Sequence, residues 1–281
     1  MLGKLKGILE ALRPRRGPGL EALLAQLTQT DARARWEAAA SLGSLVHRPG
    51  VAEALVDALG DPHPFVRWHA GESLARYRDE RTYALLEAAL SSKNLRRRSA
   101  AVDALGRLGD RRATAGLCKA LDSRNAELRC SAVEALARLG GASALSKLEK
   151  ALGDRDIHVR RAAAHALGAT GSPEAVPVLL RTLEDKSAVV RASAASALGR
   201  IASPLASDSL LRVLRDPDPG VRWQAARALG TVGKAEALPF LTPLLTDTTE
   251  VFGRTIAETA RSTIGMIEQR VKAEEQARRV H

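Results

Sequence analysis

An arginine returns at a fixed interval through most of this chain, and that regularity limits the possible fold more than any other feature. The repeat arginines are Arg67, Arg98, Arg129, Arg160, Arg191 and Arg222, each 31 residues after the one before. An earlier copy, "ARWEAAASLGSL", places Arg35 32 residues before the first of them. The next step forward reaches Gly253, where the pattern has decayed. Repeats of this length predict a solenoid, in which each unit buries its apolar face against its neighbours.

Each repeat unit resolves into two helices. "EAVPVLLRTL" (174–183) and "AVVRASAASALGRI" (188–201) both carry apolar residues three and four apart, which is the helical period. A capping side chain precedes most second helices, namely Asp31, Asn94, Asn125, Asp156, Ser187 and Asp218. Glycines follow several of them, at Gly109, Gly140, Gly171 and Gly233, where a left-handed residue can end a helix. We therefore predict an all-α fold, an α-solenoid of stacked helix pairs with about seven repeats and terminal caps.

Two stretches match a known repeat pattern nearly throughout. "LGDRDIHVRRAAAHALGATG" (152–171) and "LRDPDPGVRWQAARALGTVG" (214–233) resemble HEAT repeats of the short type found in bilin lyase subunits and related phycobilisome proteins. The resemblance covers roughly residues 20–250, which we predict to form the solenoid. Residues 1–16 are expected to form an amphipathic N-terminal helix, and residues 251–281 a divergent C-terminal capping helix with a polar tail.

The resemblance also implies a role for the repeat arginine. In HEAT-like repeats this residue usually meets a loop aspartate, so an internal ladder is expected. Four units keep the acid six residues before the arginine, giving the pairs Asp61 with Arg67, Asp154 with Arg160, Asp185 with Arg191 and Asp216 with Arg222. Ser92 and Ser123 occupy the equivalent sites elsewhere, so Arg98 and Arg129 are expected to join the ladder without that acid.

Positive charge gathers in the middle of the chain. Residues 81–171 hold 17 Lys and Arg against 9 Asp and Glu, in a chain whose net charge is +11. We predict a basic ridge along the inter-helix turns and helix starts, made of Lys93, Arg96, Arg97, Arg111, Arg112, Arg124, Arg155 and Lys186. Such a ridge would attract an acidic protein or another polyanion. The alternative is that these side chains simply extend into solvent.

A candidate groove follows from the second helices, which line the concave side in HEAT-type stacks. All three tryptophans fall in one column, directly after a repeat arginine. Tryptophan is over-represented at binding hot spots. The predicted partner-binding residues are Trp36, Trp68, His69, Arg161, His165, Trp223 and Arg227. The alternative is that each indole packs between units.

A second column of arginines stands nine residues after the repeat arginine. It contains Arg76, Arg107, Arg138 and Arg200. The first three lie four residues after an acid, a spacing that forms surface ion pairs on a helix. We therefore expect this column to be part of the scaffold.

Catalytic motifs are absent from the sequence. No His-Glu dipeptide of the deoxyhypusine hydroxylase type, nucleophile elbow, phosphate loop or metal-ligand spacing occurs. Cys118 and Cys130 are expected to be free thiols in a reducing cytoplasm. We predict a non-catalytic cytoplasmic scaffold, monomeric and without metal or cofactor, that binds a protein partner with an acidic surface through its groove and ridge. Nucleic-acid binding is the main alternative, and chromophore handling as a bilin lyase subunit is another. The N-terminal helix also leaves contact with a membrane surface open.

Overall fold

The structure, a computed structural model, describes residues 18–280. The predicted N-terminal helix, residues 1–16, lies outside the described residues. The chain divides into an N-terminal part, residues 1–110, and a C-terminal part, residues 111–281. Each part is built from helix pairs, as the period of 31 predicts.

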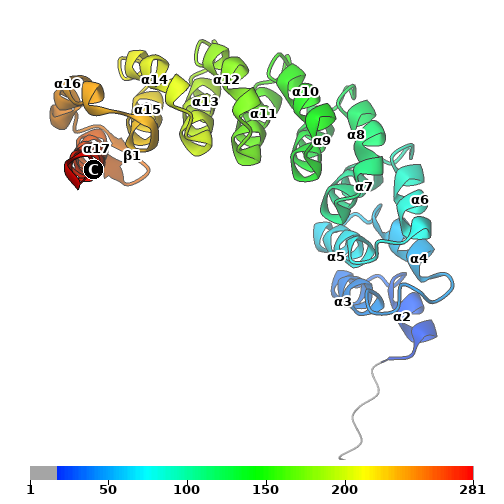
Figure 1. The fold of residues 1–281 in the computed structure, drawn as a ribbon. Helices are drawn as coiled ribbons and strands as arrows, with labels where there is room; N and C mark the ends of the chain where they lie inside the picture. The colour runs from blue at the N-terminus through cyan, green and yellow to red at the C-terminus, as the bar shows by residue number, and fades with distance from the viewer. Residues whose placement is uncertain (1–17, 281) are drawn as a thin grey trace, which may run out of the picture. The chain divides into compact units, whose positions relative to one another are not determined.

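The N-terminal part contains three helix pairs. Its first helices are α2 (Leu20–Gln26), α4 (Val51–Ala58) and α6 (Glu80–Ala89), and its second helices are α3 (Ala32–Leu42), α5 (Pro64–Ala75) and α7 (Leu95–Leu108). The second helices pack in order, α3 on α5 and α5 on α7. The first helices form a separate row beside them (Figure 1).

The C-terminal part repeats this arrangement. Its first helices are α8 (Thr114–Ala120), α10 (Ala142–Ala151), α12 (Val176–Thr182), α14 (Ser207–Val213) and α16 (Leu238–Leu241). Short 3₁₀ turns accompany four of them, at Arg111–Ala113, Pro173–Ala175, Pro204–Ala206 and Ala235–Ala237, and another covers Thr242–Thr246. Its second helices are α9 (Ala126–Leu139), α11 (Ile157–Thr170), α13 (Ala188–Ile201) and α15 (Pro219–Val232), stacked in sequence order (Figure 1).

The chain ends differently from the repeats. A two-stranded hairpin, β1 (Glu250–Val251) with β2 (Arg254–Thr255), leads into the long helix α17 (Ile256–Val280). α17 packs on α15 and buries Ile256 and Ile267. The Arg270 guanidinium donates to the carbonyls of Gly233 and Gly230, which satisfies acceptors at the end of α15. In the region predicted as a divergent cap, residues 251–281, the main element is thus a helix that packs on α15 and hydrogen-bonds to its C-terminal end.

Side-chain caps mark where the second helices begin. The Asp31, Asn94, Asn125, Asp156 and Asp218 side chains accept hydrogen bonds from backbone amides of the first turn. Ser187 occupies the same position without such a bond. Gly109, Gly140 and Gly171 have positive φ, as predicted, but Gly233 does not. A Cβ on Gly233 would lie 2.5 Å from the Leu229 carbonyl oxygen, so a larger residue at this position would clash with the backbone.

Neighbouring second helices approach closely because small residues face each other. A Cβ built on Gly168 of α11 would lie 2.6 Å from Ala197 of α13. One built on Gly199 of α13 would lie 2.8 Å from Ala228 of α15. The core is accordingly made of buried leucines, alanines and valines, with few large side chains. These thin contacts suit a chain in which only 3% of residues are aromatic.

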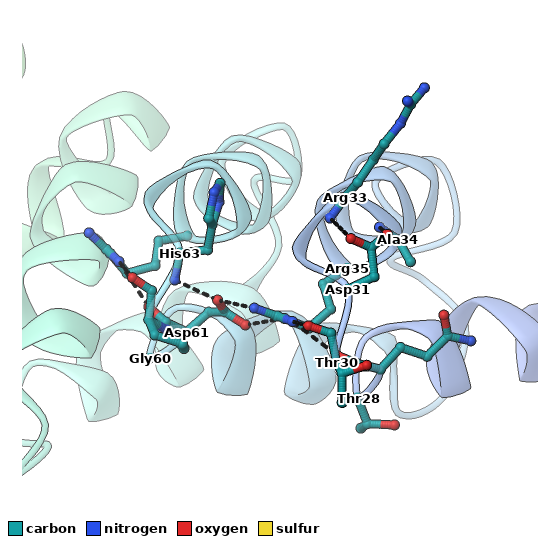
Figure 2. Close-up of polar contacts among 12 residues, drawn as sticks. Thr28, Thr30, Asp31, Arg33, Ala34, Arg35, Gly60, Asp61 and His63 are labelled. Atoms are coloured by element: carbon teal, nitrogen blue, oxygen red, sulfur yellow. Dashed lines mark hydrogen bonds and ion pairs between the residues drawn. The ribbon is translucent and has the colours of Figure 1, made fainter.

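The repeat arginines link successive units. Arg160 donates through Nε and Nη2 to the Asp185 carboxylate, at 2.8 and 3.1 Å, and through Nη1 to the Asp154 carbonyl at 2.9 Å. The same arrangement recurs for Arg129 with Asp154, Arg191 with Asp216 and Arg222 with Asp247. Figure 2 shows the equivalent pair in the N-terminal part, Arg35 with Asp61. Each arginine therefore joins the turn of its own unit to the turn of the next.

The pairing expected within one unit is therefore wrong in its partner. The aspartate six residues before a repeat arginine offers that arginine its backbone carbonyl and gives its carboxylate to the arginine of the preceding unit. Arg129 consequently has an acid, Asp154. The arginines whose position 25 residues further on is a serine are Arg67 and Arg98.

Those two arginines are bonded differently. Arg67 donates to the carbonyls of Asp61 and Pro62 and makes no ion pair within residues 18–280. The Nε of Arg98 is buried without a hydrogen-bond partner among the described residues.

The close helix approach predicts that Gly168→Ala destabilises the protein. The added methyl group would overlap the Ala197 backbone, so we expect a loss of about 1–3 kcal/mol despite the better helix propensity of alanine. Gly265→Ala in α17 is the matched control, because nothing lies within 4 Å of its added Cβ. The control should gain about 0.5–1 kcal/mol in urea unfolding followed by circular dichroism. Equal effects of the two changes would contradict the packing.

The ladder predicts loss of stability in acid. Burial alone would raise the pKa of the Asp185 carboxyl, but hydrogen bonds from the Arg160 guanidinium and the Ser187 amide hold this pKa below its ordinary value of 3.8. A carboxyl with a lowered pKa stabilises the folded state above pH 3.8, and this contribution disappears as the pH falls through the folded-state value. The pKa values of Asp61, Asp154, Asp216 and Asp247 are lowered in the same way.

Asp185→Asn should cost about 2 kcal/mol of unfolding free energy at neutral pH, because it leaves the buried Arg160 guanidinium uncompensated. The difference from the unsubstituted protein should shrink as the pH falls below 3.8. Asp208→Asn, at an exposed site in α14, is the control and should change stability by less than about 0.5 kcal/mol. A difference that stays constant down to the acid transition would refute the assigned role.

Candidate functional site

An aromatic cluster lies on the second helices of the N-terminal part. The Trp36 ring of α3 stacks on His69 of α5, with centroids 5.1 Å apart and planes inclined by 18°. His69 meets the Trp68 ring edge-on at 4.7 Å. The Arg107 guanidinium of α7 lies over Trp68, 5.4 Å from its centroid. Three consecutive second helices thus contribute to one surface of aromatic and cationic groups.

The two tryptophans of this cluster have different exposures. Trp36 is half-buried against the next unit, as the between-unit alternative predicts for an indole. Trp68 keeps 46% of its surface exposed while His69 and Arg107 fix its orientation. Holding a large apolar ring in water has no benefit for folding, so Trp68 is the stronger candidate contact.

Two adjoining hollows follow the second helices of the C-terminal part. The first, about 580 Å³, lies over α9, α11 and α13 and is lined by Arg138, Arg161 and His165, by the acid Glu134 and by several alanines. The second, about 330 Å³, lies over α11, α13 and α15 and shares Arg161 and His165 with the first. Small floor residues leave room for an extended ligand, and the surrounding cations favour an acidic one.

The third tryptophan, Trp223, lies on α15, at the C-terminal end of the two adjoining hollows. Trp223 of α15 is half-buried, with the Arg227 guanidinium 5.1 Å from its ring centroid. The Phe252 ring of the hairpin meets it at 65° with centroids 5.6 Å apart. Trp223 therefore supports a neighbouring exposed aromatic side chain more than it offers its own surface.

The predicted basic ridge is only partly a cationic surface. Lys93 and Arg96 are exposed beside the Asn94 cap of α7. In the C-terminal part, Arg124, Arg155 and Lys186 are exposed in equivalent turns, and Arg155 donates to the Arg124 carbonyl of the neighbouring unit. Exposed acids stand close to them in sequence, at Asp122, Glu127 and Glu184. The ridge of the C-terminal part is thus a mixed-charge edge.

Three predicted ridge residues are placed elsewhere. The Arg97 guanidinium forms an ion pair with the Asp57 carboxylate at 3.0 Å and donates to the Asp57 carbonyl, so it serves the fold and lines a separate hollow of about 370 Å³. Arg111 and Arg112 lie in the 3₁₀ turn before α8, whereas Arg124 follows α8. The length of the helix separates them, so they are not part of the same edge.

The second arginine column contributes more to the face than expected. Arg76 pairs with Glu72 at 3.0 Å, and Arg138 lies 4.0 Å from Glu134, as the sequence spacing predicts. Arg107 also lies over Trp68, and the Nη1 of Arg200 lies 3.1 Å from the Nε2 of His165. Two members of this column therefore belong to the candidate binding surfaces.

The described residues offer little for metal binding or for thiol chemistry. Among residues 18–280 no group of three or more His, Cys, Asp or Glu side chains is placed to hold a metal ion. Cys118 and Cys130 are unpaired thiols, and partial burial raises the pKa of both, which disfavours the nucleophilic thiolate. No helix in the described part is long and apolar enough to cross a membrane.

The sequence analysis did not predict three residues that line the second hollow. Phe252, Val189 and Gln224 all line the second hollow. The 31-residue pattern ends before Phe252, and no periodic signal points to a hairpin there. Two-residue hairpin turns typically have Asn-Gly or Asp-Gly, and Phe252-Gly253 shares only the glycine with that pattern.

Comparisons with known proteins agree with this architecture. The sequence matches the family described as HEAT repeats over residues 20–106, 114–199 and 179–260. Residues 97–123 also match the PBS lyase HEAT-like repeat. No curated protein matches the sequence at a significant level.

Several solved structures are similar. The Escherichia coli protein YibA is 18% identical, with a TM-score of 0.61 over 89% of this chain and 93% of that one. Kap95p, whose binding changes the switch loops of RanGDP, is 17% identical, with a TM-score of 0.61 over 88% of this chain and 41% of that one. The CpcE–CpcF complex of phycocyanin lyase from Nostoc sp. is 26% identical over 90% of this chain and 97% of that one, with a TM-score of 0.39. At these identities the first two show the fold alone, and the low TM-score of the third carries no inference about chemistry.

Proposed function

This chain belongs to the HEAT-repeat family, and we propose that it is a non-catalytic scaffold that holds a partner protein with an acidic surface against its second helices. The observation that carries the proposal is the exposure of Trp68, fixed between His69 and Arg107 on the face of α3, α5 and α7. An ordered, exposed indole next to a cation is typical of a protein-binding hot spot.

Electrostatics supports an acidic partner. The chain carries a net charge of +11. The hollows over α9 to α15 are bordered by Arg138, Arg161 and Arg200. The exposed ridge cations add attraction at longer range, moderated by the acids beside them. The free thiols suit a reducing compartment such as the cytoplasm.

Capture on the immobilised chain tests the proposal. Proteins retained from a lysate of the source organism at low and at high salt should be identified and then purified for direct binding. We expect one protein to bind with affinity that persists at high salt, because apolar contacts to the groove are not screened. Retention of nucleic acid alone, with affinity falling steeply as salt rises, would refute the scaffold and favour a nucleic-acid-binding role.

Trp68→Ala should weaken binding of the purified partner by about tenfold or more. Phe240→Ala is the matched control, because it removes an exposed aromatic from the first-helix row, in α16. Isothermal titration calorimetry of both variants measures the effect. Unchanged affinity for the Trp68 variant would exclude this face as the contact.

A further inference from the structure

The hairpin before α17 presents an aromatic side chain in an unusual conformation. Glu250 pairs with Thr255 and Val251 with Arg254, which leaves Phe252 and Gly253 as a two-residue turn. Both have positive φ, 53° and 77°, as a type I′ turn requires. Glycine and asparagine tolerate this region, whereas a bulky side chain is strained there. Phe252 nevertheless occupies it with 85% of its surface exposed.

The surrounding structure holds this turn in place. Asp247 accepts hydrogen bonds from the Arg222 guanidinium and the Thr249 amide, and its carbonyl accepts from the Ala257 amide. The last rung of the arginine ladder thus anchors the base of the hairpin. The Phe252 ring rests edge-on against Trp223. Strain that the neighbouring structure maintains, with no burial gained, is a reason to look for function.

Phe252 borders a hollow whose lining is partly apolar and partly cationic. The apolar lining includes Ala188, Val189 and Ala192 of α13, and Val189 is 49% exposed. Arg161, His165 and Arg200 also line this hollow. Arg161 is exposed and makes no hydrogen bond or ion pair with the described residues. The Nη1 of Arg200 contacts the Nε2 of His165, which positions a second guanidinium beside the first.

The polar groups within this hollow favour a peptide. The Oε1 of Gln224 is buried without a hydrogen-bond partner among the described residues. A rotation of the Gln224 side chain would bring this atom into the hollow, where a peptide amide could donate to it. Asp218 is the one acid in the lining, and its carboxylate is already accepting from the Val221 amide that it caps. Within this hollow Arg161 and Arg200 outnumber that one acid, and Glu134, which lines the adjoining hollow beside Arg161, lies next to Arg138 at 4.0 Å.

We propose that α11, α13, α15 and the hairpin form a docking subsite for an acidic peptide segment that carries one large apolar side chain. The apolar side chain lies between Phe252 and Val189, and the acidic side chains lie against Arg161 and Arg200. The inference rests on the proposed scaffold function and specifies the partner's recognition segment. In an extended conformation, about six residues of the segment span three helices packed about 10 Å apart.

The test uses three fluorescein-labelled peptides of about twelve residues. The first consists of Asp and Glu flanking a central Leu, the second has Ser for that Leu, and the third has Asn and Gln for the acids. Fluorescence anisotropy with the full chain should show binding of the first peptide and at least about tenfold weaker binding of the other two. Absence of binding by the first peptide would overturn the subsite.

Phe252→Asn removes the ring while keeping a residue that accepts positive φ, so its melting temperature should equal or exceed that of the unsubstituted protein. It should bind the Leu peptide about tenfold more weakly and the Ser peptide unchanged. Equal weakening for both peptides, or none for either, would contradict the apolar contact.

Arg161→Gln should weaken the acidic peptides, whereas Arg181→Gln, at an exposed site of α12 in the first-helix row, should not. Equal effects of the two would show non-specific attraction and refute the subsite. Displacement of the peptide by a single-stranded oligonucleotide with equal potency against Phe252→Asn and the unsubstituted chain would refute it as well.

The natural partner separates the two proposals. If the partner captured by the unsubstituted chain is held equally well by Phe252→Asn and Arg161→Gln, the subsite is wrong and the scaffold function stands. If the unsubstituted chain captures no protein at either salt concentration, the scaffold function is wrong.

Discussion

The bond from a repeat arginine to the carboxylate of the next unit, made by Arg35, Arg129, Arg160, Arg191 and Arg222, is the interaction on which the arrangement of most helix pairs depends. Arg160 joins the carbonyl of Asp154, in its own turn, to the carboxylate of Asp185, in the next. Because one planar guanidinium satisfies acceptors from two successive turns, it sets the spacing and the register of the helix pairs together.

The same interaction reaches the candidate site. Arg222 bonds Asp247, and Asp247 in turn organises the segment that carries the hairpin and the start of α17. A structural rung thereby positions Phe252 over Trp223 at the end of the second-helix face. Glycine and alanine contacts bring α11, α13 and α15 close together. Because small side chains also line the hollow, they leave space for a ligand beside the arginines.

Much of the fold could be predicted from the sequence, and the site much less. The 31-residue period and the caps at Asp31, Asn94 and Asp156 located the second helices, because capping and periodicity act within a few residues. The acid partner of Arg160 was assigned wrongly. Asp154 is nearer in sequence, yet the carboxylate that meets the guanidinium belongs to Asp185, and spacing along one unit cannot show how the next unit is rotated against it.

The sequence by itself determined that this chain forms stacked helix pairs, since local spacing of apolar residues, caps and small residues suffices to specify each pair and its need for neighbours. Only the tertiary structure decided which charges are neutralised and which remain available. Arg97 forms an ion pair with Asp57, and the Arg107 guanidinium lies over the Trp68 ring. Arg161, by contrast, is exposed and lines the same hollow as Phe252. These outcomes depend on distances between side chains from different units, and those distances exist only after the units have packed.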